Sequence, residues 1–275
     1  MNKVIERKII KIYNEIYKKV FNQSAITTLM HGSSAIASAR IANLQSSKQF
    51  DEFAKKFADE LAKKGLANER GIWRQFFKAA KSAHVVALPL SYKQFEYEQM
   101  SKAVQHNFIM IKSIPQKILE ILSHKYTSTL IEEVVKGKLP RGSFAKQLSI
   151  HAGKQAKVIA RTETAKLRTA ITENRATSLG SVAYIWRASN DIRTRPSHKA
   201  MNNVVVFWRK GTLKPLLDKM YGNAGEFPNC RCTAFPIFDE SDLTETNYKV
   251  YDYNTHTIIN MTKKELLEAI NKNEI

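Results

Sequence analysis

The chain changes its residue pattern at Gly180, and this change limits the folds that it can adopt. Before Gly180, apolar residues recur three and four positions apart, which is typical of amphipathic helices. After it, β-prone runs occur at 182–186, 204–208, 233–237 and 248–253. We therefore expect an α+β protein: a predominantly helical N-terminal region, then a small α+β module whose short β-sheet packs on a long helix.

The apolar stripes before Gly180 predict a series of helices that bury one face each. The first four stripes begin at Val4, Phe50, Trp73 and Phe95. Apolar side chains on one face of a soluble helix are more often core than binding surface. We therefore assign these stripes to a hydrophobic core, which a chain of 275 residues is long enough to bury.

Particular residues predict where these helices begin or end. We expect Gly65 to end the helix that carries Phe50, and Ser91 to cap the helix that carries Phe95. Pro115 is expected to start or kink a further helix. The remaining expected boundaries are Gly137 and Pro140, which stop a short amphipathic segment, and Ser143 and Gly180, which bound a long helix.

The C-terminal tail carries its own helix signal. Thr262 stands before an apolar-periodic stretch, and Glu265 follows three residues later, as in a capping box. We divide the chain into a helical N-terminal region at 1–125, a central module at 126–240 and a strand and helix tail at 241–275.

Positive charge is concentrated in the first half of the chain. The net charge is +19, and residues 1–150 alone carry 25 Lys and Arg against 12 Asp and Glu. Such a surface attracts polyanions by releasing their counterions, without reading a sequence. We therefore expect non-specific electrostatic contact with DNA, although a solvated lysine-rich helical surface would give the same composition.

The cysteine content indicates a reducing environment. Cys230 and Cys232 are the two cysteines of the chain, and one residue separates them. Two cysteines cannot form the disulfide framework of a small secreted protein. A disulfide between residues so close in sequence would also be strained.

The N-terminal segment does not resemble a secretion signal. Lys and Glu side chains interrupt its apolar residues throughout 1–20. A signal peptide needs an uninterrupted apolar stretch, and a membrane-spanning helix needs about 20 apolar residues. We therefore expect a soluble protein with no membrane partner.

Three motifs occur in order in the second half of the chain. Ala160–Ala165 reads Ala-Arg-Thr-Glu-Thr-Ala on the long helix, 191–198 reads Asp-Ile-Arg-Thr-Arg-Pro-Ser-His, and 228–233 reads Pro-Asn-Cys-Arg-Cys-Thr. This combination resembles the C-terminal signature of the Mu F-like, or phage head morphogenesis, family. The resemblance covers about 150–238. Family members often have a glycine after the motif histidine, where this chain has Asn202 and Asn203; asparagine also tolerates the left-handed backbone of such a turn.

The resemblance implies a structural role in a virion. Its family members are minor components of the phage head, associated with the portal region, with procapsid assembly and, in some members, with DNA packaging or ejection. We therefore expect a phage or prophage minor head protein and not an enzyme. Its expected partners are the portal protein, the major capsid protein and packaged DNA, in the host cytoplasm during assembly and then in the virion head.

Charged motif residues predict a polar network between the helix and the loop. Arg161 and Thr164 share one helix face, and Glu163 lies on another. We expect Glu163 to accept hydrogen bonds from the arginines of the loop and Arg161 to pair with Asp191, because a guanidinium meets a carboxylate bidentately. The full expected network is Arg161, Glu163, Thr164, Asp191, Arg193 and Arg195.

The cysteines and the motif histidine admit two interpretations. On a strand both thiols face one side, so Cys230 and Cys232 could bind zinc together with His198 and Asp191. Structural zinc normally takes cysteines separated by two to four residues, however. We therefore favour small buried thiols and a His198 that hydrogen-bonds within its loop. A structural zinc site stays open as the alternative, and no other cofactor is expected.

An enzymatic role is the competing hypothesis. A metal-dependent nuclease or a toxin-type transferase on the same module would use Glu163 as a base beside Asp191, His198 and the cysteines. The sequence contains no phosphate-binding glycine loop, zinc-protease helix or nucleophile elbow. Nothing in these patterns supports nucleotide binding, zinc proteolysis or serine hydrolysis.

Overall fold

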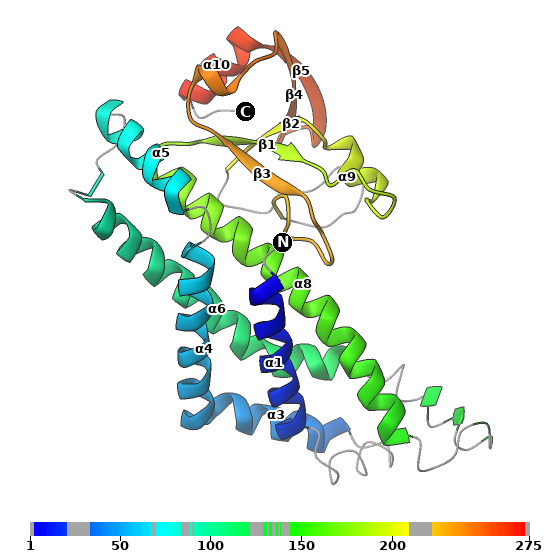
Figure 1. Cartoon of the computed structure of the whole chain (residues 1–275). Coiled ribbons are helices and arrows are strands. Elements are labelled where there is room, and N and C mark those ends of the chain that lie inside the picture. Colours follow the sequence, from blue (N-terminus) through cyan, green and yellow to red (C-terminus); the bar gives the residue numbers. More distant parts are fainter. Residues whose placement is uncertain are drawn as a thin grey trace. The chain divides into compact units, whose positions relative to one another are not determined.

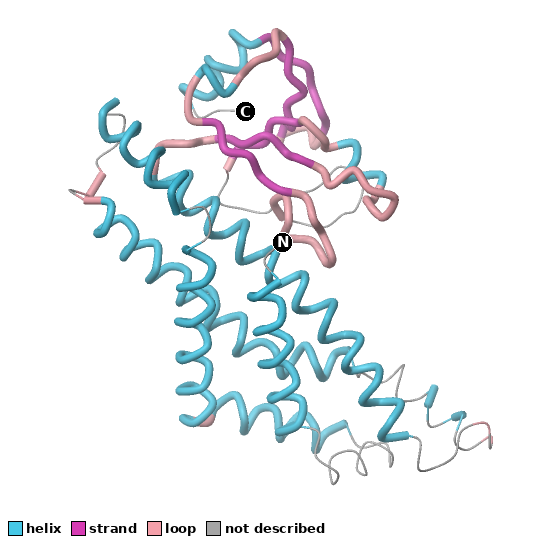
Figure 2. Tube along the Cα trace, in the orientation of Figure 1, coloured by secondary structure: helices cyan, strands magenta, loops and turns pink. Residues whose placement is uncertain are grey.

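The computed structural model describes most of the chain, and its secondary structure changes where the residue pattern does. Figure 2 shows helices up to the end of the long helix and strands after it. The described residues are 3–20, 34–67, 70–83, 88–89, 91–121, 129–130, 132–133, 136, 138, 144–208 and 222–272. The expected α+β class, with its helical N-terminal region, is confirmed.

The chain divides into two compact units, and the segments that form the two units alternate along the sequence. The helical unit comprises Asn2–Ala62 and Val104–Arg161, and the sheet unit comprises Lys63–Ala103 and Thr162–Ile275. Helices α4, α6 and α8 contribute residues to both. The helices before the sheet are α1 (Lys3–Val20), α3 (Ser34–Ser46), α4 (Lys48–Ala67), α5 (Arg70–Ala83), α6 (Tyr92–Ile121) and α8 (Phe144–Ser178) (Figure 1). The expected division at 125 and 240 stays a prediction.

The helical unit buries the apolar stripes that the spacing predicted. In α1 the buried face carries Ile9 and Ile12, and both are fully buried. In α4 it carries Phe50, over whose ring Lys112 Nζ lies 5.2 Å from the centroid. Val4, by contrast, is 54% exposed; it lies one position before the buried Ile5 and so faces away from the core.

Gly65 does not end α4, which continues to Ala67. A Cβ at Gly65 would lie 2.6 Å from Cδ1 of Ile171 in the sheet unit. The glycine therefore permits a close approach of α4 to α8, and the expectation of a helix end there was wrong. A glycine used for packing and a glycine used as a cap look the same in one sequence.

The other expected helix boundaries have mixed outcomes. Ser91 caps α6 as predicted, because its Oγ accepts a hydrogen bond from the Gln94 N–H at 3.2 Å. Pro115 lies inside α6 and starts no new helix. The expected boundaries at Gly137, Pro140 and Ser143 lie outside the described residues.

Five strands form one mixed sheet. Its order is β3-β1-β2-β4-β5; β2 and β4 are parallel, and the other neighbours are antiparallel. Strands β1 to β4 fall on the four β-prone runs, whereas β5 and the short helix α9 were not expected. The elements are β1 (Ala183–Arg187), α9 (Pro196–Ala200), β2 (Val204–Phe207), β3 (Thr233–Ile237), the 3-10 helix η2 (Glu240–Asp242), β4 (Asn247–Asp252), β5 (Thr257–Thr262) and α10 (Lys263–Lys272).

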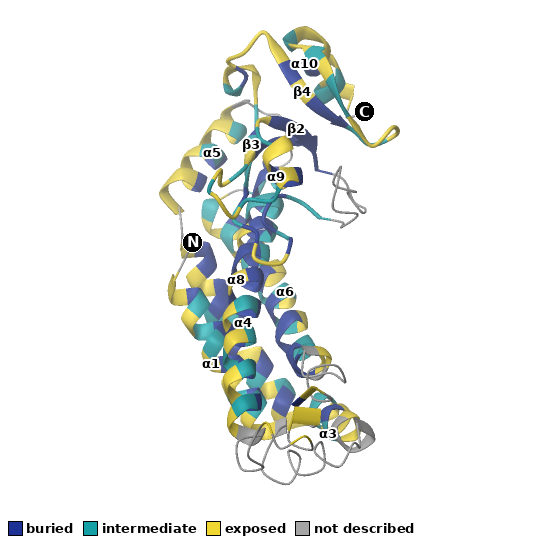
Figure 3. Ribbon diagram, turned by 90° about the vertical axis from the view of Figure 1, so that its right-hand side faces the viewer, coloured by how far each residue is buried: buried dark blue, intermediate teal, exposed yellow. Residues whose placement is uncertain are grey.

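Both faces of the sheet are buried, by different elements of the sheet unit. Alternate residues of one strand point to opposite faces. Tyr184 and Trp186 of β1 join the cluster that includes Trp73 of α5. Ile185, between them, joins the opposite cluster with Leu266 of α10. Figure 3 shows this burial along β2 and β4 in dark blue. The sheet is thus the middle layer of its unit.

The ends of the sheet elements carry local signals. Thr262 Oγ1 accepts from the Glu265 N–H at 3.3 Å, and Glu265 Oε2 accepts from the Thr262 N–H at 2.8 Å, so the predicted capping box is confirmed. Asn203 has φ of 63°, in the left-handed region that asparagine tolerates. Edge strand β3 contains Pro236, opposite Tyr184.

Among the described helices, none is long and apolar enough to cross a membrane.

Candidate metal centre

His198 is held on the short helix α9. Pro196 is the first residue of α9, where its fixed φ suits a helix start and its missing N–H is not needed. The preceding loop is shaped by Asp191, whose Oδ1 accepts from the Arg193 N–H at 2.9 Å. The His198 side chain is only 2% exposed. A turn and a proline-initiated helix therefore direct the imidazole inward.

The two cysteines lie on a tight turn just before β3. Asn229 has φ of 55°, and the Cys230 N–H donates to the Phe227 carbonyl oxygen at 2.9 Å. Beyond the turn, the Cys232 N–H donates to Cys230 Sγ at 3.4 Å. Each cysteine is 4% exposed. This turn folds the Cys230 sulfur back over Cys232.

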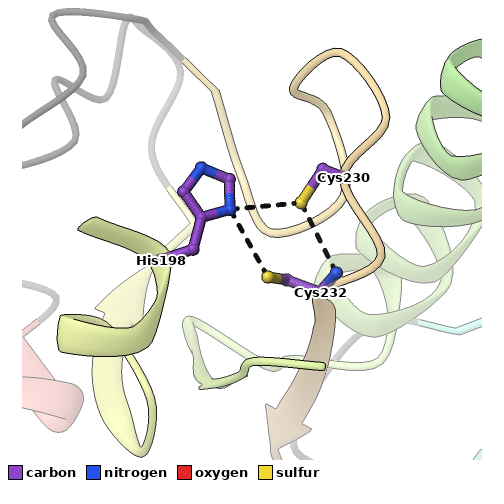
Figure 4. A group of neighbouring side chains, drawn as sticks. All are labelled: His198, Cys230 and Cys232. Atoms are coloured by element: carbon purple, nitrogen blue, oxygen red, sulfur yellow. Dashed lines mark hydrogen bonds between the residues drawn. The ribbon is translucent and has the colours of Figure 1, made fainter. Parts of the chain in front are cut away.

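The imidazole and both sulfurs converge on one point. His198 Nδ1 lies 3.4 Å from Cys230 Sγ and 3.5 Å from Cys232 Sγ. All three ligand atoms lie within 4.8 Å of one another. Figure 4 shows the same ring nitrogen facing both sulfurs. His198 therefore reaches across to the cysteine turn, and the favoured expectation of a histidine bonded within its own loop missed this contact.

Aromatic rings surround the cluster. The ring centroids of His198 and Phe227 are 4.9 Å apart, and those of His198 and Trp186 are 5.6 Å apart, both edge to face. Both cysteines belong to the same buried apolar cluster. The favoured expectation that the thiols are buried is confirmed.

The two thiols share a proton unequally. The pKa of Cys230 is lowered to about 4, first by the hydrogen bond from Cys232 and then by His198 and the Cys232 backbone N–H, against the opposing effect of burial. The pKa of Cys232 is raised, first by that same hydrogen bond and then by burial. The arrangement favours one thiolate beside one thiol, and a cation could replace the remaining proton.

Threonines of the long helix tie it to the cysteine turn. Thr162 Oγ1 accepts a hydrogen bond from the Asn229 N–H at 2.9 Å, and Thr169 Oγ1 donates to the Ala224 carbonyl oxygen at 2.7 Å. The sequence interpretation missed both contacts. The spacing of Thr162 and Thr169 could have indicated them, because positions seven apart on a helix share a face. These bonds place the Arg-Thr-Glu-Thr motif directly against the cysteine motif.

The ion pairs of the expected network are rearranged. Asp191 accepts from Arg231 Nη2 at 2.6 Å, and its pKa is lowered by that contact first. Arg161, within the helical unit, has its Nε 3.3 Å from Glu6 Oε1. The expected pair of Arg161 with Asp191 would join the two units and stays a prediction. Asp191 is also not part of the group of converging metal-ligand atoms.

The remaining network residues have the following positions. Arg195 Nη2 donates to the Pro228 carbonyl oxygen at 2.8 Å, which ties the loop to the cysteine segment. The Arg193 side chain is exposed. Glu163 is 5% exposed, with Lys166 Nζ 3.8 Å from its Oε1, and Thr164 is 3% exposed. A contact of Glu163 with the loop arginines stays a prediction.

Comparisons with known proteins point to one family. A family model described as "Phage Mu protein F like protein" matches residues 125–235. An uncharacterized protein of Haemophilus influenzae is 29% identical over 152 residues, which cover 54% of this chain and 32% of the relative. The chain thus spans about a third of that relative's length. No solved structure matches.

Proposed function

Because residues 125–235 form a phage Mu protein F-like domain, we propose that the chain is a minor head protein of a tailed phage or prophage. In this role it acts in procapsid assembly near the portal. Its partners are the portal protein, the major capsid protein and packaged DNA. It works in the host cytoplasm during assembly and is retained in the virion head.

The observation that carries this proposal is that the three family motifs meet inside the sheet unit. Thr162 bonds to the cysteine turn, Arg231 of that turn pairs with Asp191 of the loop, and His198 contacts both sulfurs. These contacts join side chains of the three motifs to one another and to backbone. Such cross-links between segments are what a rigid structural module needs. It supports a building block of the virion over a site prepared for turnover.

Helix α5 is the surface that we assign to DNA. Its buried face holds Trp73 and Phe77. Its outer face carries Arg74, Lys78 and Lys81 at spacings of four and three, and all three are exposed. The helix contains no acidic residue.

The chemistry of this face suits a phosphate backbone. Residues four and three apart on a helix share a face, so the cations form a row about 10 Å long. Arg70, one turn earlier, has its Nε 2.5 Å from Glu96 Oε1. A fixed row of cations on an anchored helix binds polyanions without sequence preference.

Composition of purified particles tests the head-protein role. Mass spectrometry of particles from the encoding phage should find this chain in DNA-filled heads, in far fewer copies than the major capsid protein. A deletion should leave phage proteins expressed but reduce the yield of filled heads, and the wild-type gene supplied in trans should restore it. Absence of the chain from every purified procapsid and particle fraction would contradict the proposal.

A second candidate function rests on the histidine and cysteine cluster. A Cys2His ligand set also occurs in catalytic zinc sites that keep one open position, so a metal-dependent nuclease or transferase could use this module. Incubation of the purified chain with supercoiled and linear DNA plus Zn²⁺, Mn²⁺ or Mg²⁺ distinguishes the two functions. We expect no cleavage. Cleavage that the His198→Ala variant abolishes would favour the enzyme.

A further inference from the structure

We propose that His198, Cys230 and Cys232 bind one Zn²⁺ ion, which fastens the cysteine turn to helix α9. The ligand atoms are His198 Nδ1 and both Sγ atoms. This proposal concerns how the sheet unit is held together. It does not depend on the role of the chain in a phage head.

The spacing of the ligand atoms fits a tetrahedral ion. With Zn–S bonds of about 2.3 Å and a Zn–N bond of about 2.05 Å at tetrahedral angles, a sulfur and the nitrogen lie about 3.6 Å apart. The His198 Nδ1 distances to Cys230 Sγ and Cys232 Sγ are 3.4 and 3.5 Å. Both nitrogen–sulfur distances are thus within a few tenths of an ångström of the value for a shared ion.

The ligand types select the metal. Two thiolates and one imidazole are soft and borderline ligands, which favour Zn²⁺ or Cu⁺ over Mg²⁺ and Ca²⁺. We choose zinc because cysteine and histidine together are its usual ligands in protein sites. Among the described His, Cys, Asp and Glu side chains, no fourth one joins the group.

The local backbone overcomes the short spacing between the cysteines. On an extended strand, two cysteines separated by a single residue would hold their sulfurs too far apart to bind one ion easily. Here the left-handed Asn229 and the bond from Cys230 N–H to Phe227 turn the chain before Cys230. The Cys232 N–H then donates to Cys230 Sγ at 3.4 Å. Such backbone donors orient and stabilise a metal-bound thiolate.

The surroundings indicate a structural ion. The rings of Trp186 and Phe227 pack against His198, and all three ligand side chains are buried. The ligand group contains no carboxylate to act as a general base. The ion would join residues 32 and 34 positions apart in sequence and would fix Cys232, which immediately precedes β3. An ion of this kind anchors the edge strand of the sheet.

Metal binding exchanges protons for the ion. Zn²⁺ binds both cysteines as thiolates, so the one that is still a thiol releases its proton to solvent, while the neutral imidazole donates the lone pair of Nδ1. No oxidation or reduction takes place.

Metal analysis of the untagged full-length chain tests the proposal. The protein is produced in zinc-supplemented medium, purified under a phosphine reductant without chelator, and analysed by inductively coupled plasma mass spectrometry. We expect one zinc per chain. The Cys230→Ser, Cys232→Ser and His198→Ala variants should each lose it. The control His256→Asn should retain it, because His256 lies outside the group and asparagine tolerates its φ of 56°.

Cobalt substitution keeps the test decisive if those variants fail to fold. Exchange of the wild-type ion for Co²⁺ should give the visible bands of a tetrahedral ion and the near-ultraviolet charge-transfer band of cobalt–thiolate bonds. Zinc-free wild-type protein whose thiols give no such band would overturn the site. So would copper as the bound metal, or zinc that survives loss of both cysteines.

Discussion

A Cβ atom added at Gly225 would lie 2.5 Å from Oγ1 of Thr169. Gly225 also has a backbone φ of 98°, which residues other than glycine rarely adopt. The same added Cβ would lie 3.2 Å from the Cys232 carbonyl oxygen. The neighbouring Ala224 carbonyl accepts the bond from Thr169. The absence of a side chain at Gly225 therefore lets this backbone lie directly against the Thr169 hydroxyl of the long helix.

The first prediction concerns this close approach. Gly225→Ala should destabilise the protein by about 3 kcal/mol, from backbone strain and overpacking together. Gly153→Ala is the matched control: it lies within α8 with nothing within 4 Å of its Cβ, so it should stabilise by up to about 1 kcal/mol. Urea unfolding followed by circular dichroism measures both. Equal effects of the two substitutions would refute the contact.

The second prediction concerns the bond between α8 and the cysteine turn. Thr162→Ala removes the acceptor of the Asn229 N–H. The loss of this partly buried hydrogen bond should cost about 0.5–1.5 kcal/mol. Thr162→Ser keeps the oxygen and should cost less than about 1 kcal/mol, from the lost methyl group. Hydrogen exchange at the Asn229 amide should be faster in the alanine variant alone, and unchanged exchange there would contradict the bond.

The third prediction tests α5 as the DNA-binding face. The triple variant Arg74→Gln, Lys78→Gln and Lys81→Gln should bind duplex DNA more weakly. Its plot of log affinity against log salt should be shallower by about 2–3 units, because each phosphate contact releases about one counterion. Fluorescence anisotropy across a salt series measures the slope.

A charge-matched control separates this face from net charge. Lys249, Lys264 and Lys272 are exposed on β4 and α10. Their simultaneous replacement by glutamine removes the same charge and should change the slope by less than half as much. Equal slopes for the two triple variants would show that DNA responds to overall charge and not to α5.

The fourth prediction is a pH dependence of stability. Burial, and then the nearby Glu226, raise the pKa of Glu173 from 4.5 to about 7. The folded chain therefore binds a proton at Glu173 more tightly than the unfolded chain does, and stability falls as pH rises from about 4.5 to 7. The nearby Tyr184 stays neutral in this range, because burial raises its pKa further above 10, and Glu226 Oε2 accepts from the Asn223 N–H at 2.7 Å.

Replacement of Glu173 removes this loss. Between pH 5 and 7.5, the free energy of unfolding should fall in Glu173→Gln by about 1–2 kcal/mol less than it falls in the wild type. This figure allows for solvent screening. Glu268→Gln, on the exposed surface of α10, serves as the control and should follow wild type. Denaturant midpoints at several pH values provide the measurement. Parallel curves for wild type and Glu173→Gln would rule out the effect.

The sequence predicted the strands better than their arrangement. The run from Val204 to Phe207 is β-branched and aromatic, so its strand has a local cause. The parallel pairing of β2 with β4 has no such cause, because it joins segments more than 40 residues apart. Strand β5 was missed because its apolar residues do not alternate: Ile258 and Ile259 are adjacent.

The sequence predicted which residues meet at the candidate site better than it predicted their contacts. The order of the motifs suggested that His198, Cys230 and Cys232 lie together, and the structure places their ligand atoms together. Arg231 was missed as a partner of Asp191, since the helix arginine looked like the natural choice. Arg231 stands between two inward-facing cysteines, so on an extended segment it must face the other way. That alternation would have identified it.

The proline in β3 has a consequence for how two copies of the sheet can meet. Strand β3 forms one border of the sheet, and an open border normally offers amide hydrogens to any passing strand. Pro236, the fourth of the five residues of β3, has no amide hydrogen to donate. The proline therefore disfavours pairing of two copies of the module through this border.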